Sequence, residues 1–142
     1  MTHFFSAQEE SQLLEAIRLA EMKTSGEIKL HVEMTCSGDP YQRAQEVFTA
    51  LKLEETALRN AVLLYWAKDS RKIAILGDSG IHAQVPPDFW QSTKDRMIAL
   101  LKANQIVPAL ISGITEAGNQ LKTFFPYQDD DQNEIPNDIS FG

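Results

Sequence analysis

One stretch of this sequence constrains the fold more than any other. Residues 60–67 read Asn-Ala-Val-Leu-Leu-Tyr-Trp-Ala and lack the two-residue alternation of a half-exposed strand. A short, continuous apolar run of this kind is typical of a strand that is covered on both faces. The sequence therefore predicts a sheet with residues 60–67 as its central strand and helices on both sides.

Residues 27–34 show the opposite pattern, because apolar and polar residues alternate there without exception. A period of two indicates a strand with one buried and one wet face. A half-wet strand does not belong in the middle of a sheet, so we expect the strand order to follow the chain order. The apolar positions are Ile28, Leu30, Val32 and Met34. The polar positions are Glu27, Lys29, His31 and Glu33.

The remaining elements follow from start signals and spacing. A capping box at Ser6 and Glu9 predicts a helix over residues 7–22, and Asp39-Pro40 begins a second helix. Residues 71–76 form a third strand after a tight turn, and two helices follow residue 86. The predicted class is α/β, with a small mixed sheet of three to four strands sandwiched by about four helices in the order α-β-α-β-β-α-α. A helix links strands one and two, which makes them parallel, and the short turn makes strands two and three antiparallel.

These strand directions bring polar residues together at one rim of the sheet. The rim holds the start of the first strand (Glu27), the start of the second (Arg59 and Asn60) and the end of the third (Asp78). Carboxylate and amide oxygens suit Ca²⁺ or Mg²⁺, so Asp78, Asn60 and Glu27 are the candidate metal ligands. Arg59 could bind a phosphate beside the metal, which makes Asp78 and Arg59 the candidate catalytic residues.

A simpler interpretation of the same rim stays open. Asp78 and Asn60 are then turn residues that bond their own backbone, and Glu27 and Arg59 form an ion pair. The opposite rim contains the start of the second helix, where Asp39 is better explained as a helix cap than as part of an anion site.

Charge and cysteine content limit the possible binding partners of the protein and the cellular compartment expected for it. The net charge of −7 argues against double-stranded nucleic acid. The single cysteine, Cys36, excludes an internal disulfide, and we found neither a membrane-spanning run nor a signal peptide, so we expect a cytoplasmic, monomeric protein. Residues 1–125 are predicted as one domain, and residues 126–142 as an acidic, mobile or loosely docked tail that has no Lys or Arg. Its acids are Asp129, Asp130, Asp131, Glu134 and Asp138.

Several different short motifs follow one another along the chain. They include Thr-Ser-Gly-Glu-Ile, Arg-Asn-Ala-Val-Leu-Leu-Tyr and Gly-Asp-Ser-Gly-Ile, and an Asn-Glu-Ile-Pro segment lies near the end at residues 133–136. Together with the other segments that precede Asn-Glu-Ile-Pro in this pattern, the motifs lie at residues 20–21, 24–28, 59–65, 71–75, 77–81, 89–90 and 113–118.

In these segments the sequence resembles the TPM domain family, and most closely its short bacterial branch. The resemblance covers about residues 5–125 and implies an α/β/α sandwich. It also implies a phosphatase-like domain with divalent cations bound by acidic loop residues, and members that act as accessory factors in the repair of membrane complexes. Asn60 and Asp78 match the family's motif positions. The family's usual Asp-Asn-Gly before the central strand is Arg59-Asn60-Ala61 here.

Two functions are consistent with these observations. The first is a divalent-cation-binding domain with weak, metal-assisted phosphomonoester hydrolysis, in which Arg59 would hold a phosphate-containing ligand. The second is a non-catalytic domain that binds a protein partner in membrane or repair complexes. The sequence offers no convincing nucleophile or base for the first.

Overall fold

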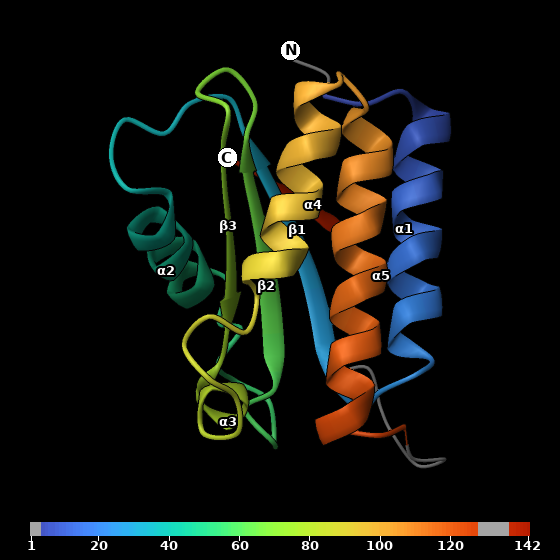
Figure 1. Ribbon diagram of the computed structural model, residues 1–142, viewed down its shortest axis with the longest axis vertical. Helices are drawn as coiled ribbons and strands as arrows, with labels where there is room; N and C mark the ends of the chain where they lie inside the picture. The colour runs from blue at the N-terminus through green and yellow to red at the C-terminus, as the bar shows by residue number, and fades with distance from the viewer. Residues whose placement is uncertain (1–3, 128–136) are drawn as a thin grey trace.

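A four-stranded mixed sheet forms the middle layer of the computed structural model, which describes residues 4–127 and 137–142 (Figure 1). The strand order is β3-β2-β1-β4. β1 is parallel to β2 and β2 is antiparallel to β3, as the connections predict, and β1 also runs parallel to β4. The strands are β1 (Glu27–Glu33), β2 (Ala61–Ala67), β3 (Lys72–Gly77) and β4 (Ile139–Phe141).

Helices cover both faces of this sheet, which confirms the predicted class (Figure 1). Three long helices pack on one face, and α2 packs on the other face against β2 and β3. The helices are α1 (Ala7–Glu21), α2 (Pro40–Ala50), α3 (Ser79–His82), α4 (Gln91–Lys102) and α5 (Ile106–Phe124). In this described part of the chain, no helix combines the length and the apolar character that a bilayer crossing requires.

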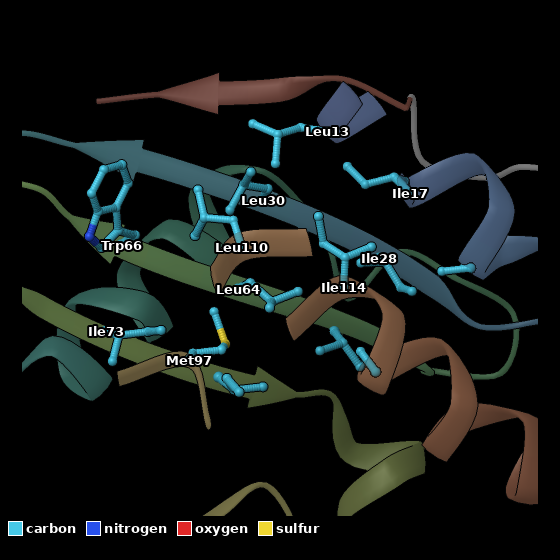
Figure 2. Packing of buried hydrophobic residues seen from close by; sticks show 14 of the residues in the cluster. Leu13, Ile17, Ile28, Leu30, Leu64, Trp66, Ile73, Met97, Leu110 and Ile114 are labelled. Carbon is cyan, nitrogen blue, oxygen red and sulfur yellow. The ribbon is translucent and has the colours of Figure 1, made fainter. Parts of the chain in front are cut away.

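The central strand was predicted correctly, since every residue of β2 is buried. Alternate side chains enter two separate apolar clusters. Val62, Leu64 and Trp66 pack among α1, α4 and α5, and Figure 2 shows Leu64 and Trp66 in this cluster. Leu63 and Tyr65 pack on the other face, against α2. A strand that fills two cores cannot alternate between apolar and polar residues, which explains its composition.

The predicted helix starts are confirmed at two caps. The Ser6 hydroxyl accepts a hydrogen bond from the Glu9 amide at 3.1 Å, and the Glu9 side chain accepts one from the Ser6 amide at 2.8 Å. Asp39 caps α2 through the Tyr41 amide. The start predicted near residue 86 is wrong by several residues, because α4 begins at Gln91 after a series of turns, and the short α3 was not predicted.

The prediction for β1 is wrong in an informative way. Both of its faces are buried, and β1 lies inside the sheet because β4 pairs with its free edge. β4 comes from the segment that we expected to be a mobile or loosely docked tail. Residues 128–136, with most of the predicted acidic positions, lie outside the described residues, so the division at residue 125 stays a prediction.

Candidate functional site

The predicted rim exists at the end of the sheet where β1 and β2 begin and β3 ends. Glu27 lies beside Ala61 in the parallel register, and the Asp78 amide donates to the Ala61 carbonyl at 2.9 Å. Glu27, Ala61 and Asp78 therefore lie side by side, with Asp78 directly after the end of β3. Residues in register on neighbouring strands point to the same face, which here is the face covered by α2.

The Asp78 carboxylate is already neutralised within the chain. Arg59 donates to it through Nε at 2.9 Å and through Nη2 at 3.2 Å, and the Ser79 amide donates to Oδ1 at 2.7 Å, which caps α3. Asp78 is only 7% exposed. The simpler interpretation paired Arg59 with Glu27, whereas the described structure pairs Arg59 with Asp78.

The other two predicted metal ligands lie in different surroundings. Glu27 forms a side-chain hydrogen bond with Glu21, and burial raises the pKa of Glu21. Asn60 is 1% exposed, and its Nδ2 lacks a hydrogen-bond partner among the described residues. An amide nitrogen does not bind a cation, and across residues 4–127 and 137–142 no three acidic, histidine or cysteine side chains are grouped to hold a metal. In this arrangement, with Arg59 bound to Asp78, the described side chains are not grouped to hold a divalent cation.

An open groove of about 570 Å³ lies between α2 and α3 and reaches Asp78. Of the described residues that line it, Asp78 alone carries a formal charge at neutral pH when histidine is counted as neutral. Since Arg59 compensates that charge, the groove is close to electrically neutral. Its side chains include Tyr41, Gln45, Phe48, Thr49, Leu76, Ser79 and His82.

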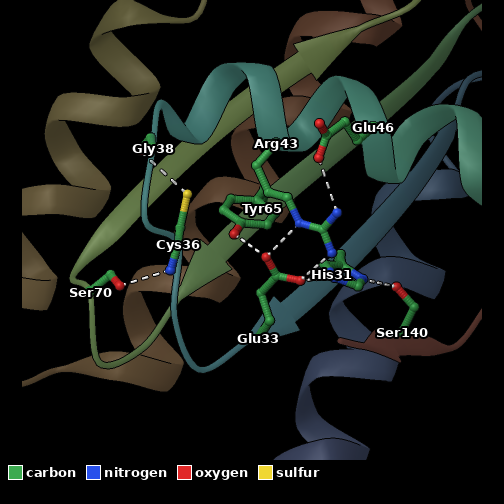
Figure 3. A network of polar contacts seen from close by, with 9 residues as sticks. All are labelled: His31, Glu33, Cys36, Gly38, Arg43, Glu46, Tyr65, Ser70 and Ser140. Carbon is green, nitrogen blue, oxygen red and sulfur yellow. Dashed lines mark hydrogen bonds and ion pairs between the residues drawn. The ribbon is translucent and has the colours of Figure 1, made fainter.

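A second polar cluster, which the sequence analysis missed, surrounds Glu33 on the same face of the sheet (Figure 3). Arg43 from α2 donates to both carboxylate oxygens, through Nε at 2.9 Å and through Nη2 at 3.0 Å. The Tyr65 hydroxyl and His31 Nε2 complete the contacts, the latter at 3.0 Å. His31 Nδ1 lies 2.5 Å from the Ser140 hydroxyl. The sequence signal for this cluster was the hydroxyl of Tyr65, which is a polar group in the otherwise apolar β2, together with the ionisable residues of the neighbouring β1.

These contacts shift the pKa of each member of the cluster. Burial alone would raise the pKa of Glu33, but the hydrogen bonds from Arg43, Tyr65 and His31 outweigh it and lower that pKa to about 2. Burial and the bond to Glu33 raise the pKa of Tyr65, and burial lowers the pKa of His31. The cluster is therefore an ionised carboxylate held by three donors at neutral pH.

The chain of contacts from Ser140 through His31 to Glu33 has the connectivity of a catalytic triad, but its electrostatics differ. In a triad the carboxylate stabilises the positive imidazole that forms during the reaction. Here Arg43 neutralises Glu33, and burial disfavours a charged His31. The arrangement supports a structural contact between β1 and β4 and not nucleophilic catalysis.

Comparison with known proteins is consistent with this geometry. A family model described as the TPM domain matches residues 1–120. The chain belongs to the TPM domain family. It is similar to the solution structure of the BA42 protein from the psychrophilic bacterium Bizionia argentinensis, with 41% identity, a TM-score of 0.93, and coverage of 100% of this chain and 98% of that one.

More distant structures share the fold of this TPM domain. The N-terminal domain of a protein from P. gingivalis has 14% identity and a TM-score of 0.69, covering 87% of this chain and 82% of that one. The N-terminal domain of the cg2496 protein from Corynebacterium glutamicum has 12% identity and a TM-score of 0.65, covering 96% and 80%. No curated protein matches the chain.

The motif residues of this TPM domain have clear structural roles. The Glu21 carboxylate accepts from the Ile28 amide at 2.8 Å, and the Thr24 hydroxyl accepts from the Gly26 amide at 3.0 Å, so both hold the connection from α1 to β1. Asp78 caps α3, and the Gly80 amide donates to the Arg59 carbonyl at 2.8 Å. These motif residues therefore close the loops at the start of β1 and at the end of β3.

Proposed function

We propose that this TPM domain is a non-catalytic binding domain, which takes an uncharged side chain of a protein partner into the groove between α2 and α3. The observation that supports this best is the neutralisation of Asp78 by Arg59, which leaves the groove without a free charge. A neutral groove attracts neither a phosphate nor a metal ion strongly. Tyr41 and Phe48 offer apolar surface, and Gln45 offers hydrogen bonds.

The groove also lacks an assembled hydrolytic apparatus. Ser79 and His82 both line it, one turn apart on α3, but no hydrogen bond joins them in the described structure. A serine without a base in contact is a poor nucleophile. An accessory role in a larger complex, which the family resemblance implies, would then depend on contact alone.

Binding in the groove can be measured by amide NMR with N-acetyl-phenylalanine amide as the probe. We expect saturable shifts at Gln45, Ser79 and His82, with a dissociation constant on the order of millimolar because the probe is small. Tyr41→Ala should weaken binding about tenfold, since Tyr41 is partly exposed on the groove wall.

Tyr127→Ala is the matched control, because Tyr127 is also an exposed tyrosine and does not line the groove. Shifts that are scattered over the surface, or that respond equally to the two variants, would contradict the proposal.

Divalent cation binding is the second candidate, and one observation favours it. Glu27 and Asp78 lie on the same face on either side of the small residue Ala61, so displacement of Arg59 would leave two carboxylates flanking an open position. Titration with Ca²⁺ and Mg²⁺ tests this directly. Saturable shifts at Glu27, Asn60 and Asp78, and p-nitrophenyl phosphate hydrolysis that Asp78→Asn abolishes, would replace our proposal with the metal-dependent one.

A further inference from the structure

Four ionisable side chains form a buried row along one face of β1. Glu27, Lys29, His31 and Glu33 alternate along the strand and are only 3–5% exposed. Burying such groups is costly unless each has a polar partner in place. Arg43 of α2 and Tyr65 of β2 supply partners for Glu33, but α2 packs mainly on β2 and β3, so Lys29 and His31 need partners from another part of the chain.

Much of the row is matched by the C-terminal segment, residues 138–142. His31 lies beside Ser140 in the parallel register of β1 and β4, and their side chains are in contact. Lys29 forms an ion pair with Asp138. The Gly142 amide extends the ladder by donating to the Val32 carbonyl at 2.9 Å.

The row also selects against a side chain at the last position. A Cβ atom at residue 142 would lie 2.3 Å from Glu33 Oε1 and 2.8 Å from His31 Nε2, so any larger residue there would force these two hydrogen-bonded side chains to move. The row therefore recognises an acid, a hydroxyl and a glycine at alternate positions. The intervening residues face the opposite side, where Ile139 packs on the main core and Phe141 stacks on Phe4 with ring centroids 5.5 Å apart.

The two segments that form this contact differ in how extensively they pair with the rest of the fold. Lys29, His31 and Glu33 belong to a strand paired along its whole length with β2. By contrast, β4 is three residues long, the Asp138 side chain is 63% exposed, and Phe141 is 48% exposed. A short strand with such exposed side chains opens at a small fraction of the cost of global unfolding.

We propose that the polar row of β1 is a peptide-binding site with the specificity Asp-x-Ser-x-Gly, and that residues 138–142 of a second copy of this chain can occupy it in place of the chain's own. We choose a second copy of this chain as the occupant because its residues 138–142 would reproduce all three contacts: the ion pair with Lys29, the hydroxyl contact with His31 and the close fit of the glycine. Addition of a strand to a sheet edge is an established mode of recognition, and exchange of a terminal element creates a symmetric dimer. The site is distinct from the groove and does not depend on its function.

A charge-swap experiment between two full-length variants tests the exchange. Lys29→Glu and Asp138→Lys each place two like charges at this ion pair within one chain. When the two variants exchange their residues 138–142, each segment meets an opposite charge at position 29 of the other copy. We expect each variant alone to be monomeric and an equimolar mixture to form a heterodimer, about tenfold more abundant than either homodimer, by native mass spectrometry. The double variant in one chain should remain a monomer.

Matched swaps at an exposed pair on α1, Glu15→Arg in one copy and Arg18→Glu in the other, should give no heterodimer. A mixture of folded Lys29→Glu and Asp138→Lys chains that stays monomeric would overturn the proposal.

A second experiment covers the case in which Lys29→Glu fails to fold. The full-length Asp138→Lys variant is titrated with the peptide acetyl-Asn-Asp-Ile-Ser-Phe-Gly, which is residues 137–142. We expect saturable amide shifts at Lys29, His31 and Val32, and about tenfold weaker binding when the peptide's glycine is replaced by alanine. Absence of saturable shifts, or equal binding of the two peptides, would show that β1 does not recognise this segment.

Discussion

Replacing Glu33 by glutamine is expected to lower the free energy of unfolding by about 3 kcal/mol at pH 7. The Glu33→Gln change removes the one negative charge that Arg43, Tyr65 and His31 share. The lowered pKa of Glu33, about 2 against an ordinary value of 4.5, sets the size of this effect. Urea denaturation followed by circular dichroism measures it.

The pH dependence of the same variant provides a second readout. Because folding lowers the pKa of Glu33, its contribution is fully present above about pH 4.5 and is lost as the pH falls towards 2. The difference between wild type and Glu33→Gln should therefore be constant from pH 5 to pH 7 and shrink below that range.

Glu46→Gln is the matched control, since Glu46 is the other partner of Arg43 but its side chain is 60% exposed. We expect this change to cost less than about 0.5 kcal/mol. Equal losses in the two variants would mean that the ionised Glu33 cluster does not stabilise the fold as described.

Replacing Gly80 by alanine is expected to cost about 3 kcal/mol of stability. A Cβ atom at this position would lie 2.2 Å from the Leu58 carbonyl oxygen and 2.6 Å from that of Arg59. Both atoms belong to backbone, so relief requires α3 to move away from the loop before β2. That movement would also separate Arg59 from Asp78, and thermal unfolding should show the loss as a lower midpoint.

Gly38→Ala provides the comparison, because a Cβ there would meet nothing within 4 Å. We expect this variant to be within about 1 kcal/mol of wild type, with the change towards greater stability. If Gly80→Ala is equally well tolerated, the Gly77-Asp78-Ser79-Gly80 motif does not owe its residues to close packing on the preceding loop.

The candidate site could be predicted in position but not in its contacts. Strand directions alone placed Glu27, Asn60 and Asp78 at one rim, and the register of β1, β2 and β3 confirms that proximity. The pairing of Arg59 with Asp78 could not be predicted, because it depends on the loop before β2, where Arg59 adopts a left-handed φ of 50°. Without that loop conformation, the sequence allows Arg59 to pair with any of several carboxylates.

The face of β1 shows the same division between local and long-range information. Alternation correctly predicted a strand, since the period of two is a property of the strand itself. It wrongly predicted a wet face, because what covers a face depends on elements that are distant in the chain. Lys29 and Asp138 are 109 residues apart, and nothing near either one in the sequence indicates the other.

The sequence by itself determined the order and type of the main elements, the central place of residues 60–67 and the family to which the chain belongs. These follow from hydrophobic periodicity, helix caps and motif order, which act over a few residues. The tertiary structure alone decided that Arg59 neutralises Asp78 and that residues 138–142 match the polar row of β1. Both depend on the alignment of distant segments, and only the packed chain fixes which buried charge meets which partner.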